Sequence, residues 1–355
     1  MESLVMKTGF WQNKSVAVTG HTGFKGGWLS LWLSLLGAKV HGFSLPPEKE
    51  HSFFIKTNLA EKLKTNCLGD VRDIKQVKNF FSQAKPEIVF HLAAQPLVRK
   101  SYELPLDTFS TNVSGTINLL ETVRNTSDVN AVINVTTDKC YKNQEWTWPY
   151  RENDVIGGDD PYSASKSCSE IISHAYKQSF FKQHGVKIAT ARAGNVIGGG
   201  DFAEDRLIPD AFRAMETNTL LKLRAPHSVR PWQHVLAPLD GYIKLAEALC
   251  STSKNYEEAW NFGPDPAESV TVLSLIKSLK QAFPSLEFDS STTDGPAETL
   301  TLTLDSSKAR KELEWNNKWC IKKSVKETLN WHFSCLNGED MHDVTSKQIK
   351  NYMAS

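Results

Sequence analysis

The chain has 355 residues and is almost neutral, with 41 Lys and Arg residues against 40 Asp and Glu residues and a net charge of +1. At roughly 100–200 residues per domain, this length predicts two domains or one large one. The content of 40% hydrophobic and 23% charged residues is typical of a globular protein in water. The near-zero charge argues against a nucleic-acid-binding protein that neutralises many phosphates, but it does not exclude binding of a small anion.

The sequence predicts a cytoplasmic protein without a membrane span. Its most apolar early stretch, residues 28–38, is too short to cross a bilayer and is interrupted by Ser30, Ser34 and Gly37. The residues before the first strand-like run lack the apolar core and cleavage site of a signal peptide. No two cysteines form a CxxC pair, so we expect reduced thiols, no disulfides and no metal site. The cysteines are Cys67, Cys140, Cys168, Cys250, Cys320 and Cys335.

The first half of the chain alternates short strand-like runs with helix-like segments, whose apolar residues recur every three or four positions. We expect strands at residues 15–19, 39–43, 66–69, 87–91, 131–136 and 186–191. We expect helices at residues 24–36, 73–84, 111–124 and 162–181. Repeated β-α-β order predicts an α/β fold of the Rossmann type, a doubly wound parallel sheet with helices on both faces. Ligands of such a sheet bind beyond the carboxyl ends of its strands.

The second half is less regular, because glycine and proline in residues 198–200 and 225–232 interrupt the alternation. We expect helices at residues 240–250, 272–283, 306–313 and 322–333, and strands at residues 260–262 and 299–304. No repeat or low-complexity linker separates two units, so the domains are predicted to be interleaved. Residues 1–194 with about 233–264 would form a nucleotide-binding domain, and about 195–232 with 265–355 a smaller α/β substrate-binding domain.

A glycine-rich loop follows the first predicted strand and opens the first helix. Gly20 would allow a tight turn, Gly23 would let the backbone approach a pyrophosphate, and Gly26 would let the helix lie close to the sheet. The helix amino terminus then offers free N–H groups to phosphates. The loop predicts binding of a dinucleotide. The cofactor-binding residues that we expect here, with those in the later GDVRD segment, are Gly20, Thr22, Gly23, Phe24, Lys25, Gly26, Asp70 and Val71.

The second predicted strand ends in the sequence Phe43-Ser44-Leu45-Pro46. In many NAD sites an acidic residue at this point binds the adenosine ribose, and in NADP sites an arginine accommodates the 2′-phosphate. Neither residue type is present, so the residues themselves leave the choice between NAD and NADP open.

The strongest catalytic signal is Tyr162 with Lys166, which lie on one face of a helix at positions i and i+4. Free tyrosine has a pKa near 10 and is a poor base at neutral pH, and a nearby ammonium lowers that pKa. The strand at residues 131–136 runs into Thr137, Asp138 and Lys139. A hydroxyl, a carboxylate and an amine at the carboxyl end of a strand would face the same site as the glycine loop.

Together these motifs resemble the extended short-chain dehydrogenase/reductases from about residue 12 past residue 265. Within them, the chain is most similar to the CDP-glucose 4,6-dehydratase family. The stretches that carry the resemblance are GHTGFKGGWLSLWL, HLAAQPLVRKSYE, VTTDKCY, ARAGNVIGGGDFAEDRLIPD, VRPWQHVLAPLDGY and WNFGP.

The resemblance implies a redox-neutral dehydration of CDP-glucose to CDP-4-dehydro-6-deoxyglucose with NAD as cofactor. Tyr162 would take the proton from the sugar 4-hydroxyl while hydride leaves C4. A base would then remove the C5 proton, an acid would help the C6 hydroxyl to depart as water, and hydride would return to C6. The product would enter deoxysugar biosynthesis for surface polysaccharide such as O-antigen lipopolysaccharide. The resemblance also places Ala93 and Ala94 at the cofactor.

Within this scheme Thr137 would contact the region of the 4-hydroxyl, and Asp138 would be the acid for the C6 hydroxyl. Related dTDP-glucose dehydratases carry a glutamate next, as the C5 base, where this chain has Lys139. A lysine is a poor base unless it is desolvated or close to other cations. Lys139 is therefore expected either to be the base or to stabilise the enolate while another group moves the proton.

The substrate carries a diphosphate, which the planar fork of arginine can bind through two parallel hydrogen bonds. Arg206 and Arg230 lie in the irregular second half, as a substrate clamp would. Residues 220–224 are expected near the nucleobase, and only the resemblance indicates cytosine. His234 is expected to be structural rather than catalytic. The predicted substrate-binding residues, most of them assigned by resemblance, are Gln95, Asn195, Arg206, Arg230 and Asn261.

The helix at residues 111–124 carries apolar Val113, Ile117, Leu120 and Val123, which face either the sheet or a second subunit. The resemblance implies a homodimer through this helix and the one that carries Tyr162, possibly doubled to a tetramer. Two other functions remain open, a 4-epimerase or reductase on the same fold and a non-catalytic nucleotide-binding scaffold. The Asp138-Lys139 pair argues against the first and Tyr162 with Lys166 argues against the second.

Overall fold

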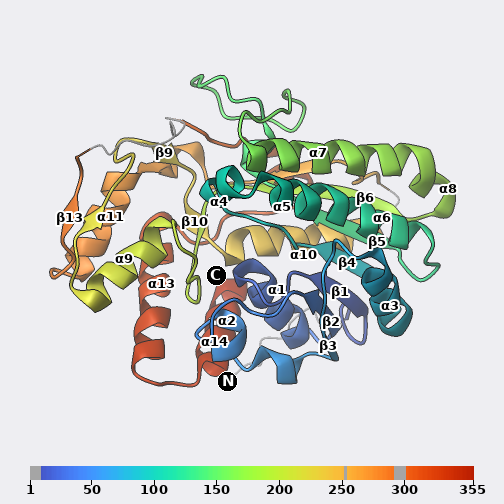
Figure 1. Ribbon diagram of the computed structural model, residues 1–355, viewed down its shortest axis with the longest axis horizontal. Coiled ribbons are helices and arrows are strands. Elements are labelled where there is room, and N and C mark those ends of the chain that lie inside the picture. Colours follow the sequence, from blue (N-terminus) through green and yellow to red (C-terminus); the bar gives the residue numbers. More distant parts are fainter. Residues whose placement is uncertain (1–8, 252–253, 292–300) are drawn as a thin grey trace.

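The computed structural model describes residues 9–251, 254–291 and 301–355. Its centre is a seven-stranded parallel sheet with the strand order β11-β6-β5-β4-β1-β2-β3 (Figure 1). This sheet confirms the predicted Rossmann-type doubly wound α/β class, and every strand expected in the first half is present within two residues of its expected bounds. The strands are β1 (Ser15–Thr19), β2 (Lys39–Ser44), β3 (Thr65–Leu68), β4 (Ile88–His91), β5 (Ala131–Val135), β6 (Lys187–Ala193) and β11 (Ala259–Phe262).

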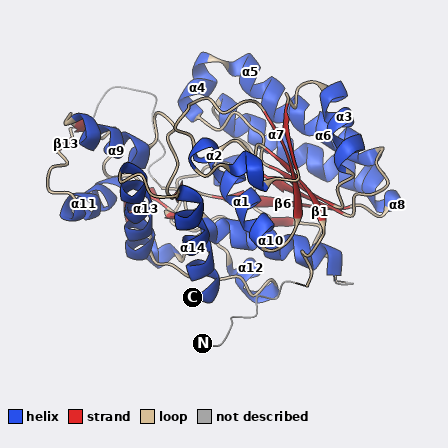
Figure 2. Cartoon of the chain, turned by 90° about the horizontal axis from the view of Figure 1, so that it is seen from below, coloured by secondary structure: helices blue, strands red, loops and turns tan. Residues whose placement is uncertain are grey.

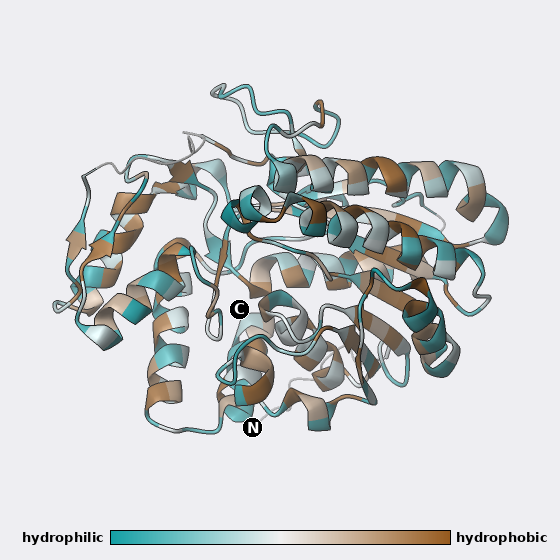
Figure 3. Ribbon diagram, viewed as in Figure 1, coloured by the Kyte–Doolittle hydropathy of each residue, from teal (hydrophilic) through white to brown (hydrophobic). Residues whose placement is uncertain are grey.

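Helices cover both faces of the sheet because successive strand residues point to opposite sides. Val16 and Val18 of β1 pack in one core with α1 (Phe24–Leu35) and α10 (Leu236–Ser251). Ala17, between them, packs in a second core with α3 (Ile74–Ala84) and α6 (Gly115–Arg124). The two layers lie on either side of the sheet in Figure 2, and Figure 3 shows the hydrophobic residues along the central strands.

The helix expected at residues 111–124 is longer than the pattern indicated. It begins in α5 (Pro105–Phe109), passes through a π-helical turn at Ser110–Ser114 and continues as α6. A short helix, α4 (Val98–Glu103), precedes it. The helix of Tyr162, α7 (Pro161–Tyr176), likewise continues through a π segment at Lys177–Phe181 into α8 (Lys182–His184). Figure 1 shows α5, α6 and α7 side by side above the sheet.

The less regular half is built on pairs of two-residue strands and on helices that share a core of their own. The pairs are β7 (Val196–Ile197) with β10 (Gln233–His234), β9 (Val229–Arg230) with β12 (Val270–Thr271), and β8 (Leu221–Lys222) with β13 (Phe288–Asp289). The helices of this core are α9 (Leu207–Thr217), α11 (Val272–Ala282) and α13 (Ile321–Leu336), whereas α12 (Ser307–Glu312) and α14 (Met341–Ala354) pack in the core of the central sheet. Short elements elsewhere are α2 (Phe53–Lys56), η1 (Leu59–Lys62), η3 (Asp138–Cys140) and η5 (Pro266–Glu268).

The prediction of a strand at residues 299–304 was wrong for residues 301–304, the part of this run that the structure describes. Residues 299 and 300 lie outside the described residues, and the rest of the run makes only isolated bridges, between Leu304 and Tyr150 and between Thr301 and Val229. The run is apolar because Leu302 and Leu304 fill a small core with Tyr141 and Tyr150, without a sheet.

In the part of the chain that the structure describes, no helix is both long and apolar enough to cross a membrane.

An aromatic cluster joins the helix that follows the glycine loop to the irregular half. Trp28 of α1 donates a hydrogen bond from Nε1 to the carbonyl oxygen of Gly199 at 2.9 Å. Phe53 stacks on Trp28 and on Trp331, with ring centroids 5.2 and 6.2 Å apart. A Cβ atom added at Gly199 would lie 1.9 Å from Cγ of Trp331. Glycine is therefore required at position 199 to let the loop lie against this cluster.

We predict that Gly199→Ala lowers the free energy of unfolding by about 2 kcal/mol, because its methyl group overpacks the buried tryptophans. Urea unfolding followed by tryptophan fluorescence would measure the change. Gly9→Ala is the matched control, since a Cβ there has no atom within 4 Å, and it should change stability by less than about 0.5 kcal/mol. Equal stability of the two variants would show that the cluster does not constrain this loop.

Candidate functional site

A cavity of about 1390 Å³ opens at the carboxyl ends of the central strands and extends to the short-strand region. The residues that follow β1, β4, β5 and β6 all contribute to its wall. This is the position in which ligands bind to a doubly wound parallel sheet. Of the predicted catalytic, cofactor-binding and substrate-binding residues, all except Asn261 line it.

The glycine loop forms one end of the cavity with the geometry that the sequence predicted. Gly20 has a φ of +79°, and a Cβ there would lie 2.8 Å from the backbone nitrogen of Ala93. A Cβ at Gly26 would lie 2.1 Å from the carbonyl oxygen of Gly20. The N-cap of α1 is Gly23, which offers no side-chain cap to the first helical N–H groups. These N–H groups are thus available to an anion, and the dipole of the helix favours one there.

Further polar residues surround this loop along the edge of the sheet. The Thr22 hydroxyl lies 2.8 Å from Oγ of Ser44 and donates to the carbonyl oxygen of Leu45 at 2.9 Å. Asp70 is paired with Arg72, with 2.6 Å between Oδ2 and Nη2, and the hydrogen bonds from Arg72 lower the pKa of that carboxyl. The other predicted contacts on this wall are Phe24, Val71, Ala93 and Ala94.

Tyr162 and Lys166 lie together in the wall because α7 begins immediately before them. Asp160 caps the helix by accepting a hydrogen bond from the Ser163 N–H at 3.0 Å, and Pro161 occupies the first turn. The Tyr162 and Lys166 side chains are nearly buried. Nζ of Lys166 donates to the carbonyl oxygen of Val135, the last residue of β5, at 3.2 Å. The predicted pair is therefore fixed to the strand that leads to Thr137.

Burial shifts the pKa of both groups away from their ordinary values. It lowers the pKa of Lys166 to about 8, against the raising effect of the Glu170 carboxylate one turn further along α7. It raises the pKa of Tyr162 to about 12, against the lowering effect of a hydrogen bond with Thr137. Both shifts favour the neutral side chains, so Tyr162 needs a further positive charge in the cavity to act as a base at neutral pH.

The residues after β5 form a single turn, η3, with the carboxylate turned inward. Oγ1 of Thr137 donates to Oδ1 of Asp138 at 3.0 Å and accepts from the backbone N–H of Lys139. Asp138 is 1% exposed, and its Oδ2 is buried without a hydrogen-bond partner among the described residues. Nζ of Lys139 lies 3.8 Å from Oδ1 of Asp138. Asp138 lines the cavity, and its Oδ2 lies on the side of Gly194, where an added Cβ would approach it to 2.9 Å.

Lys25, in the glycine loop, is a further lysine in this cavity. Loss of hydration and the guanidinium of Arg206 lower the pKa of its ammonium, the carboxylates of Asp138 and Asp201 oppose them, and the resulting pKa is about 8. Lys25 therefore lies within electrostatic range of both the catalytic segment and the irregular half.

Four of the five predicted substrate contacts line the cavity, namely Gln95, Asn195, Arg206 and Arg230. Arg206 Nη1 lies 3.2 Å from Oδ2 of Asp201, and Arg230 is 8% exposed. Oδ1 of Asn195 is buried without a hydrogen-bond partner in the part of the chain that the structure describes. Two guanidinium groups and a carboxamide thus face the half of the cavity remote from the glycine loop.

Of the predicted substrate contacts, Asn261 does not reach the cavity, and Gln95 borders it with its side chain bonded to the protein. Asn261 is completely buried outside the cavity, where it accepts from the Tyr141 hydroxyl and donates to the carbonyl oxygen of Tyr150. Gln95 borders the cavity, but its amide nitrogen donates to Leu97 and Thr108 and its amide oxygen accepts from the Leu97 N–H. Both side chains hold loops in place, because their donors and acceptors are satisfied within the protein.

The sequence did not single out several charged residues that the structure brings to this region. Asp205 accepts from Arg99 and Arg224, which come from the two sides of the cavity, at 3.5 and 3.0 Å. Beneath the cavity, Glu170 and Arg192 form a buried ion pair. The spacing of Glu170 four residues after Lys166 was a usable signal for a functional carboxylate, whereas nothing local marks Arg192.

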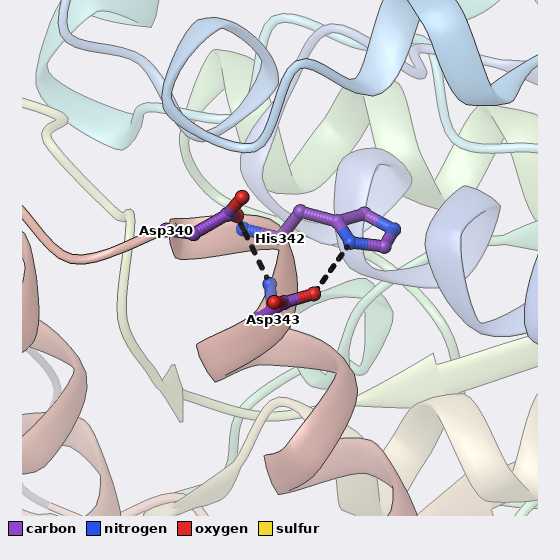
Figure 4. Close-up of side chains that lie close together, drawn as sticks. All are labelled: Asp340, His342 and Asp343. Carbon is purple, nitrogen blue, oxygen red and sulfur yellow. Dashed lines mark hydrogen bonds and ion pairs between the residues drawn. The ribbon is translucent and has the colours of Figure 1, made fainter.

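Two features outside the cavity have structural explanations. His234 is fully buried between Trp28 and Trp319, and burial lowers its pKa to about 3, which agrees with the structural role expected for it. Asp340, His342 and Asp343 lie close together at the start of α14 (Figure 4). Asp340 caps this helix by accepting from the His342 and Asp343 N–H groups, which explains the cluster. All six cysteines are free.

The sequence profile of the GDP-mannose 4,6 dehydratase family matches residues 17–328. The chain belongs to this family. CDP-glucose 4,6-dehydratase of Salmonella typhimurium is 47% identical to it over 355 residues, which cover 98% of each chain. The resemblance inferred from the motifs is therefore confirmed at the level of the family, and the similarity extends through both halves of the fold.

Solved structures with lower sequence identity share the same fold. The dTDP-glucose 4,6-dehydratase of Bacillus anthracis in complex with NAD aligns with a TM-score of 0.77 at 18% identity, and covers 93% of this chain and 99% of its own. The UDP-glucose 4-epimerase of Thermotoga maritima with UDP-glucose aligns with a TM-score of 0.77 at 23% identity, and covers 90% and 99%. The fold thus hosts both dehydratases and epimerases, so the reaction has to be argued from the residues of the site.

We predict that Lys166→Met raises the free energy of unfolding at neutral pH by about 2 kcal/mol, because it removes a poorly solvated ammonium at the loss of one hydrogen bond. The pKa of Lys166 falls from 10.5 to about 8 on folding. Between these values the unfolded chain binds more protons, so wild-type stability rises with pH across the window. The advantage of the variant is therefore largest below pH 8 and shrinks toward pH 10.5. Urea unfolding at a series of pH values would measure it.

Tyr162→Phe is the control, since it removes a hydroxyl from the same helix face and no cation. It should not show the same dependence on pH. A Lys166→Met protein less stable than the wild type at neutral pH would contradict the assignment of a destabilising charge to this position.

Proposed function

We propose that the protein is an NAD-dependent CDP-glucose 4,6-dehydratase, which converts CDP-glucose to CDP-4-dehydro-6-deoxyglucose and water. The observation that carries this proposal is the arrangement of Asp138 and Lys139 beside Tyr162 and Lys166 in one cavity with the glycine loop. Tyr162 with Lys166 can exchange the proton of a sugar hydroxyl. The neighbouring carboxylate and amine can serve as the acid and the base that elimination of water requires. The relative of that name, at 47% identity, supports the choice of cytidine and glucose.

The residues of the glycine loop fit a dinucleotide. Backbone N–H groups at the start of α1 are free of side-chain caps, and Gly20 and Gly26 leave no room for a Cβ where the loop turns. A pyrophosphate would therefore meet backbone rather than side chains at this point. When bound, NAD supplies the acceptor for the C4 hydride and the donor that returns it to C6. Its cationic ring would also supply the positive charge that Tyr162 needs.

Tyr162 receives the proton of the sugar 4-hydroxyl as C4 is oxidised, and it returns the proton if the reaction reverses. Thr137, which contacts the tyrosine hydroxyl, orients both groups. Lys166 favours the phenolate electrostatically while its ammonium is held at Val135. Because Tyr162 and Lys166 are nearly buried, bound substrate completes the exclusion of water and strengthens these interactions.

Oxidation at C4 acidifies the C5 proton, and the remaining residues carry out the elimination. Asp138, which lines the cavity, donates a proton to the departing C6 hydroxyl. Lys139 either removes the C5 proton or stabilises the enolate that results. A proton must return to C5 when C6 accepts the hydride, so that one water leaves and no net reduction of NAD occurs. The other half of the cavity, with Asn195, Arg206 and Arg230, would bind the diphosphate.

We propose that the two interleaved domains divide the binding of cofactor and substrate between them. Residues 1–194 with about 233–264 would bind NAD, since they supply all seven central strands, and about 195–232 with 265–355 would bind the sugar nucleotide. We propose a cytoplasmic enzyme of deoxysugar biosynthesis for surface polysaccharide.

We also propose a homodimer, because the neighbouring helices α5–α6 and α7 expose apolar side chains, and two such dimers could form a tetramer. These side chains are Leu106, Phe109, Ile117 and Ile171.

The function is tested by incubating the purified protein and NAD with CDP-glucose, and in parallel with UDP-, dTDP- and GDP-glucose, and by following product mass. We expect loss of one water from CDP-glucose alone, without net formation of NADH. Water loss from another nucleotide sugar would keep the chemistry and reject cytidine, and an isobaric product would indicate epimerisation instead.

Two variants separate the steps of this reaction. Tyr162→Phe should abolish reduction of bound NAD, because the 4-hydroxyl proton has no acceptor. Asp138→Asn should still reduce bound NAD while it slows water loss by about 10²-fold or more. Equal loss of both steps in Asp138→Asn would place this carboxylate elsewhere in the mechanism.

The dimer is tested by the double variant Ile117→Lys with Ile171→Lys, which puts charges on the proposed contact helices. We expect the double variant to sediment as a monomer. The monomer should remain folded, because both side chains are partly exposed. Ile55→Lys, at a similarly exposed position on α2, should remain dimeric. Unchanged assembly of the double variant would exclude this face.

A further inference from the structure

The reaction scheme leaves the most deeply buried ion pair of the site region without a role. Glu170 of α7 and Arg192 of β6 are 5% and 4% exposed, and neither lines the cavity. The contact is bidentate, with Nε of Arg192 donating to Oε1 of Glu170 at 2.9 Å and Nη2 donating to Oε2 at 2.8 Å. Buried pairs of this kind are weak evidence for stability, since apolar side chains of similar volume often serve as well.

The carboxylate of Glu170 accepts two further hydrogen bonds, one from the residue that follows β5 and one from β6. Thr136 donates its hydroxyl to Oε1, and Thr190 of β6 donates its hydroxyl to Oε2 at 2.7 Å. The two threonines are equally buried. They differ in position, because Thr136 lines the cavity and immediately precedes Thr137 and Asp138, whereas Thr190 lies within β6 and does not line the cavity.

The guanidinium of Arg192 reaches the other side of the same segment. Its Nη1 donates to the hydroxyl of Tyr141 at 2.8 Å, and its Cζ lies 4.8 Å from the centre of the tyrosine ring. The Tyr141 hydroxyl donates in turn to Oδ1 of Asn261 at 2.7 Å. The ion pair therefore holds the chain at residue 136, before the catalytic turn, and at residue 141, after it.

We propose that Glu170 and Arg192 are positioning residues that hold residues 137–139 in place for the loss of water, and that they act through Thr136 and Tyr141. The proposal rests on the assignment of Asp138 as the acid for the C6 hydroxyl. Glu170 also belongs to the helix that carries Tyr162 and Lys166. The pair thus sets the distance between the group that serves oxidation at C4 and the group that serves elimination at C6.

The geometry explains why the elimination depends on such a support more than the oxidation does. Tyr162 and Lys166 are held by the regular hydrogen bonds of α7 and by the contact with Val135. The turn of residues 138–140 has one short 3₁₀ helix and no further regular structure. A displacement of about 1 Å at a reacting group lowers the rate by about 10²-fold. Loss of the support should therefore affect Asp138 before it affects Tyr162.

The test compares Thr136→Val with Thr190→Val, each of which removes one hydroxyl donor from the same buried carboxylate. We expect Thr136→Val to lower kcat by about tenfold and to accumulate reduced nicotinamide during turnover, because water loss becomes slower than hydride transfer. Thr190→Val should stay within about threefold of the wild type and accumulate none. Stopped-flow absorbance of the reduced cofactor, with kcat and KM for CDP-glucose, would measure this, and urea unfolding would show that the variants lose similar stability.

Tyr141→Phe tests the second contact without placing a charge in a new environment. It should accumulate reduced nicotinamide as Thr136→Val does. Equal effects of Thr136→Val and Thr190→Val, or a Thr136→Val variant in which hydride transfer slows as much as water loss, would overturn the proposal. A wild-type protein that reduces no cofactor with CDP-glucose would contradict the proposed function instead, so the two failures are distinguishable.

Discussion

The burial of the Lys166 ammonium is the constraint on which the rest of the site depends. Loss of hydration lowers its pKa to about 8, so the charge persists at neutral pH only because nearby groups offset that loss. The carbonyl oxygen of Val135 accepts a hydrogen bond from this ammonium, and the Glu170 carboxylate lies one helical turn away. One contact is at the end of β5 and the other is within α7, so the lysine fixes the strand and the helix relative to each other. Tyr162 and Thr137 meet at the place that this spacing creates.

A dehydratase that returns its hydride must carry out two kinds of chemistry on one bound sugar. The structure supplies them from two elements, with Tyr162 on a long helix and Asp138 on a short turn. The helix is rigid through its own hydrogen bonds, whereas the turn depends on side chains around it. The carboxylate of Glu170, on this helix, accepts a hydrogen bond from Thr136 and so connects the helix to the turn. The buried pair of Glu170 and Arg192 is therefore more informative about geometry than about stability.

The parts of the fold and site that local patterns encode could be predicted from the sequence. Alternating strands and helices, the turn at Gly20 and the i, i+4 pair of Tyr162 and Lys166 all depend on neighbouring residues. Two-residue strands such as β8 show no periodicity, so their pairs were not predicted, and neither were α9 and α14. Gln95 and Asn261 were assigned to substrate by resemblance, yet both side chains make hydrogen bonds within the protein, and Asn261 does not reach the cavity. Such partners come from distant segments that a linear pattern does not identify.

The interleaving of the two halves has a mechanical consequence for the site. The loop that leads to Arg206 passes through Gly199, whose carbonyl oxygen accepts from Trp28 of the helix that follows the glycine loop. Trp331, from near the end of the chain, packs against the same glycine. A movement of the loop proposed to bind the diphosphate would therefore break a buried hydrogen bond and open an aromatic core, which large-to-small substitutions show to be unfavourable by several kcal/mol. The cofactor loop and the substrate loop are thus held as one unit, and the sugar must fit a distance that the protein has already set.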